Sequence, residues 1–302
     1  MSDADGTTRT RAGRGTLLVA LGACGFGTIS TLVTIATGAG APLDSVIFWR
    51  YALAIPVLVG FAVAKGVLRF DRHALKTMAI AGLGQTLIAV ITLSALKYVS
   101  VATLAFLFYT FPAWVALIAR VRHSEPLTPT RLAALALSLG GIAVMVGAPD
   151  SALHPIGVAL ALIGALIYAA YIPLLDELQR TSGPLGTTAW MSVGTAGFMA
   201  IIALWQRDLV VMMHVTAWKA VLGLALVSTA GAFFMFMKGL QILGSVRTAI
   251  VSTVEPFFTA LLGAWALSQP LTGGTLVGGA MIAFAVILLQ IRGRENGPAP
   301  AT

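Results

Sequence analysis

The chain has 302 residues, of which 58% are hydrophobic and only 10% are charged. Soluble domains carry about 25% charged residues, so this composition excludes a soluble globular protein and indicates a polytopic membrane protein. The formal net charge of +8 does not indicate a nucleic-acid partner, because the basic residues gather on one side of the predicted membrane spans. The single cysteine, Cys24, excludes an intrachain disulfide and a cysteine metal cluster.

The apolar runs, taken in chain order, predict an all-α polytopic membrane protein with ten transmembrane helices. Residues 1–15 are polar and are expected to form a cytoplasmic tail rather than a signal peptide. A crossing needs about 20 mostly apolar residues. Charges, prolines and glycines divide the rest into spans at 17–36, 45–64, 76–95, 99–119, 131–148, 155–175, 186–205, 217–237, 247–267 and 273–291. Residues 293–302 are expected to form a second cytoplasmic tail.

The distribution of Lys and Arg predicts that both termini face the cytoplasm. With the N-terminus inside, fifteen of the 19 basic residues fall in inner segments. Arg50 lies within a span, and the outer segments hold Lys97, Arg207 and Lys219. Because cytoplasmic loops carry an excess of Lys and Arg, this asymmetry favours an even number of spans with both termini inside.

Two segments of the chain match when the sequence is shifted by 144 residues, the first beginning at Ala95 and the second at Gly239. The identical pairs include Leu96/Leu240, Ala105/Ala249, Pro112/Pro256, Ala116/Ala260, Leu117/Leu261, Pro126/Pro270, Leu127/Leu271 and Thr128/Thr272. The match predicts two repeats, 16–150 and 151–292, of five spans each. Because five is odd, the second repeat is expected to be inverted, as in secondary transporters, whose substrate site lies near the membrane midplane between the repeats.

The mid-span Pro112 and Pro256, the (Glu/Gln)-Pro-Leu-Thr run that follows each, and the glycine-containing last span resemble the EamA domain. The run FWRYALAIP, with Arg50, resembles the Arg-containing second span of that domain. Two tandem copies over about 15–292 resemble the drug/metabolite transporter superfamily, and the chain is most similar to its bacterial amino-acid and metabolite exporters, including the aromatic-amino-acid type. The sequence departs from a symmetric pattern, because Arg50 has Met191 opposite it and Glu255 has Phe111.

The resemblance implies a secondary transporter in the bacterial cytoplasmic (inner) membrane that exports small metabolites, foremost amino acids, by alternating access through a central cavity. It implies a small-molecule substrate, the lipid bilayer and a proton as coupling ion as partners, with no cofactor and no metal. A monomer or a weak dimer is expected.

Glu255 is the only charged residue between Thr248 and Ile291. Thr248, Ser252 and Glu255 follow a spacing of four and three, which places them on one polar face of a helix. An acid near the middle of a span is a functional site by default. Glu255 is therefore expected to bind a substrate ammonium group or to take up a proton in each cycle. The alternative is a permanently neutral, hydrogen-bonded structural acid.

Pro256 and Pro112 are expected to bend their helices and to take part in gating. Proline lacks an N–H group and clashes with the carbonyl four residues earlier, so these two prolines free the carbonyls of Ser252 and Phe108. Freed carbonyls inside a membrane are tolerated where polar groups or water can satisfy them.

The other predicted pathway residues are Arg50, Gln85, Thr92, Tyr109, Tyr168 and Tyr171. Arg50 either clamps a substrate carboxylate, pairs with Asp44 or Glu255, or extends toward the interface, and a structural or gating role is favoured. Gln85 and Thr92 share a small polar face, which either binds polar groups of a substrate or forms hydrogen bonds between helices. The three tyrosines either stack on an aromatic substrate or pack against one another.

Three other functions compete with amino-acid export. A multidrug exporter of organic cations would use Glu255 as its cation site. An intramembrane enzyme is disfavoured, because the sequence has no HExxH, no GxSxG and no pair of intramembrane aspartates. A channel is disfavoured because no repeated filter loop is visible.

Overall fold

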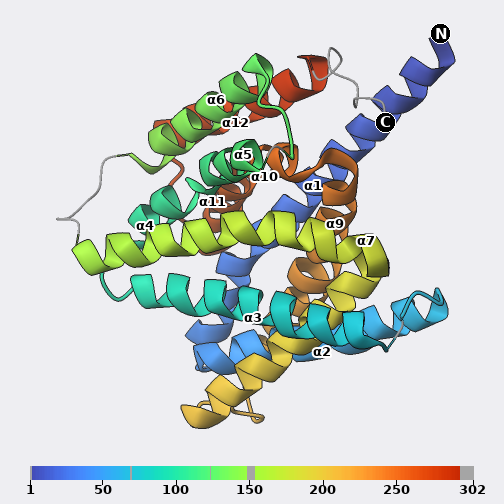
Figure 1. Ribbon diagram of the computed structural model, residues 1–302. Coiled ribbons are helices and arrows are strands. Elements are labelled where there is room, and N and C mark those ends of the chain that lie inside the picture. Colours follow the sequence, from blue (N-terminus) through green and yellow to red (C-terminus); the bar gives the residue numbers. More distant parts are fainter. Residues whose placement is uncertain (1, 69, 123, 148–153, 293–302) are drawn as a thin grey trace.

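The computed structural model describes residues 2–68, 70–122, 124–147 and 154–292, and every regular element in these ranges is a helix (Figure 1). The all-α prediction is confirmed. The elements are α1 (Ser2–Gly38), α2 (Leu43–Ala64), α3 (Arg72–Ala95), α4 (Val101–Phe108), α5 (Phe111–Val121), α6 (Pro129–Val146), α7 (Pro155–Trp205), α8 (Val215–Gly223), η1 (Leu224–Gly231), α9 (Ala232–Leu243), α10 (Ser245–Ser252), α11 (Val254–Leu267) and α12 (Gly273–Arg292).

Eight helical stretches among the described residues are long and apolar enough to cross a membrane, which confirms a polytopic membrane protein. One of them, α7, has 51 residues and contains a kink at Gly183, where φ is 66° and the backbone is not helical. The kink separates the predicted spans 155–175 and 186–205, and the residues between them are largely helical rather than an open loop. A shorter apolar helix follows at the C-terminal end. The count of ten spans remains a prediction.

The N-terminal segment predicted as a cytoplasmic tail is helical. Helix α1 begins at Ser2, so residues 2–15 extend the first membrane helix by several turns. The segment is rich in Gly and Thr, which are poor helix formers, so local propensity does not explain this extension, and its cytoplasmic location remains a prediction. The predicted tail at 293–302 lies outside the described residues.

Both predicted proline positions coincide with interruptions of a helix. Helix α4 ends at Phe108 and α5 begins at Phe111, so that Pro112 lies in the first turn of α5. Helix α10 ends at Ser252 and α11 begins at Val254, with Pro256 in its first turn. A proline in a first turn sacrifices no intrahelical hydrogen bond, so each proline starts a new helix within the predicted span.

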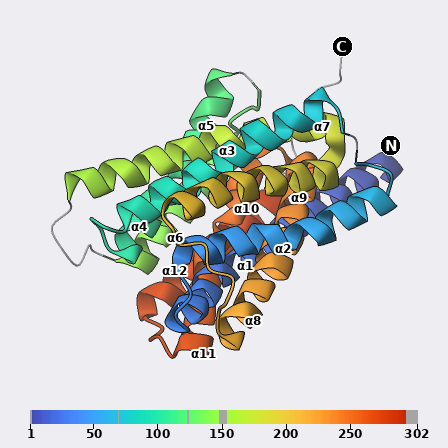
Figure 2. The ribbon, with the colours of Figure 1, turned by 90° about the horizontal axis from the view of Figure 1, so that it is seen from below.

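Helices from the two parts of the chain pack against each other throughout the molecule. Helix α3 lies along α7, α6 lies along α12, and α1 packs on α9 and α11 (Figures 1 and 2). Glycines make these contacts close, since a Cβ atom added to Gly82 would lie 2.6 Å from the backbone of Gly194. Small residues allow membrane helices to approach in this way. The second helix of one interrupted pair, α5, contacts both α7 and α10, the first helix of the other.

Candidate functional site

Glu255 lies in the first turn of α11, directly after the interruption that follows α10. The side chain of Tyr109, at the end of α4, lies beside the Glu255 carboxyl group. The two interrupted helices therefore meet at a carboxyl group and a phenol. Arg50 and Tyr168 are close enough to Glu255 to interact with it electrostatically. We call Glu255, Tyr109, Tyr168 and Arg50 the central polar cluster.

Tyr51 joins this cluster to Gln85, and sequence reasoning missed it. The Tyr51 side chain is buried and lies beside the Gln85 side chain. The guanidinium carbon of Arg50 lies 5.1 Å from the centre of the Tyr51 ring, a distance typical of a cation–π contact. The available signal was local, because Tyr51 follows Arg50 in an otherwise apolar span.

The tyrosine rings of the cluster already have aromatic neighbours. Tyr168 stacks on Phe108 with ring centres 5.4 Å apart and meets the edge of Phe111 at 4.7 Å. Tyr109 contacts the same two phenylalanines. Packing therefore accounts for the rings, and Tyr109 is also a neighbour of Glu255.

Three of the predicted pathway residues use their hydroxyl groups within the helix bundle. The Tyr171 hydroxyl donates to the carbonyl of Ala81 at 2.7 Å and fastens α7 to α3. Thr92 Oγ1 donates to the Ile88 carbonyl of its own helix at 2.7 Å. Ser252 Oγ likewise donates to Ala249 at 2.9 Å. Tyr171 and Thr92 thus use their hydroxyl groups in helix packing. This was the alternative to substrate binding for the tyrosines and for the polar face of α3.

Thr248 is different, because its side chain is fully buried and its Oγ1 atom has no hydrogen-bond partner among the described residues. Buried hydroxyl groups are rarely left without a partner. Thr248 lies on the predicted polar face with Ser252 and Glu255. Among all the residues that the structure describes, no group of three or more His, Cys, Asp or Glu could bind a metal ion.

Arg50 is buried and holds the π-helix η1. Its Nε–H donates to Thr229 Oγ1 at 2.7 Å, and one terminal nitrogen donates to the Ser228 carbonyl at 3.4 Å. No ion pair joins Arg50 to Asp44 or Glu255 in the described ranges. π-Helical turns are uncommon and often occur at functional sites. Here the guanidinium group donates hydrogen bonds to a hydroxyl and a carbonyl group of the π-helix.

Replacing Arg50 by Lys is expected to lower the thermal stability of the purified protein and its transport rate. A lysine ammonium is a compact point charge and does not reproduce the planar fork that reaches Thr229 and Ser228 together. Hydrogen bonds from charged groups contribute about 1.5–3 kcal/mol each. Thermal unfolding in detergent and initial uptake rates measure both effects. Arg207→Lys, at an exposed position, is the matched control, and equal melting curves for the two variants would contradict the assignment.

The model of the EamA-like transporter family matches the chain twice, over residues 13–147 and 155–291. An uncharacterized transporter of Archaeoglobus fulgidus is 28% identical over 197 residues, which cover 65% of this chain and 69% of that protein. A riboflavin transporter of Brucella anthropi is 28% identical over 60% of this chain and 63% of its own length. The uncharacterized transporter YcbK of Bacillus subtilis is 22% identical over 95% of this chain and 96% of its own length.

A solved crystal structure has the same fold, with a TM-score of 0.79, 21% identity, and coverage of 93% of this chain and 98% of that chain. This likeness extends over nearly the whole molecule and concerns the fold alone. The two family matches together cover most of the sequence. The chain therefore belongs to the EamA-like transporter family.

Proposed function

We propose that this protein is a secondary transporter that exports small metabolites, foremost amino acids, by alternating access through a central cavity between residues 16–150 and 151–292. The membership of the family and the named relatives establish the broader role, transport of a small molecule by a multi-pass membrane protein. The substrate class, the direction and the mechanism are our proposal.

The observation that carries the proposal is the central polar cluster. It places a carboxyl group, Glu255, and a guanidinium group, Arg50, within electrostatic range in an otherwise apolar bundle. An amino acid carries an ammonium and a carboxylate group, and these would meet groups of opposite charge. Arg50 uses Nε and one terminal nitrogen in the contacts with η1, and the guanidinium has five N–H donors. Donors therefore remain for a substrate carboxylate.

The pairing of helices supports alternating access. In the repeat, the first part of the kinked α7 is the counterpart of α1, and α9 belongs to the counterpart of α3. The contact of α1 with α9 is therefore equivalent to the contact of α7 with α3, and both are present. Such paired contacts would let one repeat rock against the other around a fixed site, as in transporters built from inverted repeats.

A second substrate class is favoured by one relative. The riboflavin transporter of Brucella anthropi moves a substrate with a flat aromatic ring system. The rings of Tyr109 and Tyr168 pack on Phe108 and Phe111, so their hydroxyl groups rather than their aromatic faces would meet such a substrate. Transport of a flavin is therefore the alternative to transport of an amino acid.

Counterflow in proteoliposomes separates these substrates. Vesicles are loaded with single amino acids, with riboflavin or with a quaternary ammonium compound, and the exchange of labelled substrate is measured at two pH values. Saturable counterflow with amino acids is the expected result. Counterflow with riboflavin or the organic cation alone would reject the amino-acid proposal, and a flux that neither saturates nor shows counterflow would reject a carrier mechanism.

A further inference from the structure

A partly buried carboxylate joins the two halves of the chain on one side of the molecule. Glu125, in the connector between α5 and α6, accepts hydrogen bonds at Oε1 from the backbone N–H groups of Ser245 at 2.7 Å and Val246 at 3.2 Å. Its Oε2 atom pairs with Arg131 at 3.2 Å. The first-half connector thereby caps α10, the helix that leads to Glu255.

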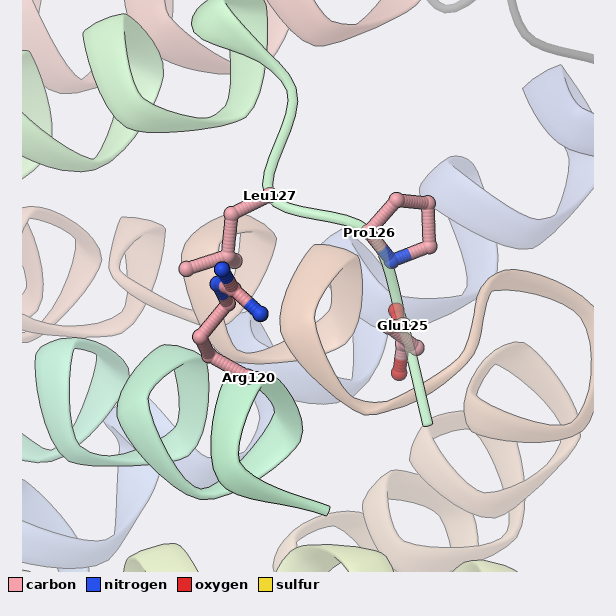
Figure 3. A pocket seen from close by; sticks show the side chains of 4 residues that line it. All are labelled: Arg120, Glu125, Pro126 and Leu127. Atoms are coloured by element: carbon pink, nitrogen blue, oxygen red, sulfur yellow. The ribbon is translucent and has the colours of Figure 1, made fainter. Parts of the chain in front are cut away.

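The surroundings of Glu125 are shaped for this contact. Glu125, Arg120, Pro126 and Leu127 line a cavity of about 420 Å³, and Figure 3 shows these four side chains. Gly244 precedes α10 with φ of 77°, and a Cβ atom at this position would lie 3.0 Å from Glu125 Oε1. A glycine is therefore needed both for the backbone conformation and for the approach of the carboxylate.

The internal repeat gives this contact a counterpart. The shift of 144 residues that aligns Pro112 with Pro256 also aligns Glu125 with Gln269, and Ser245 with Val101 at the start of α4. The equivalent contact would join Gln269 to the N-terminus of α4 on the opposite side of an inverted pair of repeats.

The counterpart contact is open in this structure. Gln269 is exposed, and its backbone N–H donates to the Gly263 carbonyl of its own half at 3.2 Å. The N-terminus of α4 is capped instead by Ser100 Oγ, which accepts from the N–H of Thr103 at 3.2 Å. The side chain of Gln269 lies against Gly263 of its own half, where an added Cβ atom would overlap its Oε1 atom. The two equivalent contacts are thus in different states.

We propose that Glu125 and Gln269 are alternating latches: the Glu125 latch holds the α10 side closed, and it opens when Gln269 closes on α4. This inference rests on the proposed alternating access. It explains why equivalent connectors of one chain differ, because a symmetric carrier must break one inter-half contact as it makes the other. On the orientation predicted from the basic residues, the Glu125 latch is cytoplasmic.

A latch must also open readily. Burial raises the pKa of the Glu125 carboxyl group, while Arg131 and the two N–H groups oppose that rise. Removing a carboxylate from water has a cost that its pairing only partly offsets. Asp176 of α7 raises the pKa of this carboxyl group further. Arg247 of α10 is close enough to Glu125 to interact with it electrostatically. The contact is therefore specific in geometry and modest in net stability, as a contact broken in each cycle requires.

The latch is tested by the accessibility of a thiol placed behind it. In a Cys24→Ser background, Thr248→Cys introduces a thiol on α10 one turn beyond Ser245, at a position that is fully buried. A membrane-impermeant maleimide is applied in the absence of substrate to the face that carries the α5–α6 connector. Glu125→Ala should raise the labelling rate about tenfold, since it leaves two helix N–H groups without their charged acceptor. Gln269→Ala, which keeps the Glu125 contact intact, should leave the rate unchanged.

Gly244→Ala provides a second variant that keeps the carboxylate. The added Cβ and the positive φ should force the same opening, so labelling should rise here as well. Labelling rates equal to the parent in both Glu125→Ala and Gly244→Ala, or an equal rise in Gln269→Ala, would overturn the latch. The labelling rate is measured without substrate. The latch proposal can therefore be rejected while counterflow supports the proposed function, and the proposed function can be rejected while labelling supports the latch.

Discussion

Replacing Glu255 by Gln is expected to reduce the initial rate of counterflow by about 10- to 100-fold while the protein remains folded. The amide has the shape of the carboxyl group, so packing in the first turn of α11 is retained. The change removes the charge that would bind a substrate ammonium group or exchange a proton. A hydrogen bond to a charged group contributes about 1.5–3 kcal/mol, and each 1.4 kcal/mol is a factor of ten. Substrate counterflow at two pH values measures the effect.

The control for this variant is Glu177→Gln, which makes the same chemical change on an exposed position of α7. It should transport like the parent. Both variants should show the thermal unfolding curve of the parent in detergent. A Glu255→Gln protein with the parent's rate and the parent's pH dependence would show that Glu255 is a structural acid, the alternative that the sequence left open.

The parts of the site that depend on local chemistry could be predicted from the sequence. Pro112 and Pro256 lack an N–H group, which favours an interruption, and the structure has one next to both. Pro56 and Pro173 lie inside continuous helices, so a proline within a span does not by itself require an interruption. Glu255 could be selected because a lone acid within a long apolar run needs an interior polar partner. That partner, Tyr109, was selected only as one of several tyrosines.

Partners across the bundle could not be predicted, because they depend on how the helices pack. Tyr171 and Tyr168 lie three residues apart on one helix, yet the hydroxyl of Tyr171 bonds to the backbone of α3. For Arg50 a structural or gating role was favoured, with a substrate carboxylate, an acid or the interface as possible partners, and in the structure its partner is η1. A π-helical turn has no reliable sequence signal, so the acceptors that Arg50 uses were not visible. Glu125 was part of the repeat motif without an assigned role.

Replacing Gly194 by Ala is expected to destabilise the protein by about 3 kcal/mol, the upper end of the usual cost of overpacking. The Cβ atom would overlap the carbonyl oxygen of Met78 in α3 and lie 3.1 Å from the Cα atom of Gly82. Backbone atoms cannot move aside as a flexible side chain can, so α3 and α7 would have to separate. Thermal unfolding in detergent measures the loss.

Gly197, one turn later on α7, is the matched control, because a Cβ atom there would meet nothing within 4 Å. Gly197→Ala should be neutral or slightly stabilising, since alanine favours a helix over glycine by up to about 1 kcal/mol. The contact between α3 and α7 is a contact between the two halves of the chain, so Gly194→Ala should impair counterflow as well as stability. Equal melting temperatures for the two variants would mean that the halves do not pack backbone to backbone at Gly82. The close contact of α3 with α7 would then not be what places Gln85 beside Tyr51.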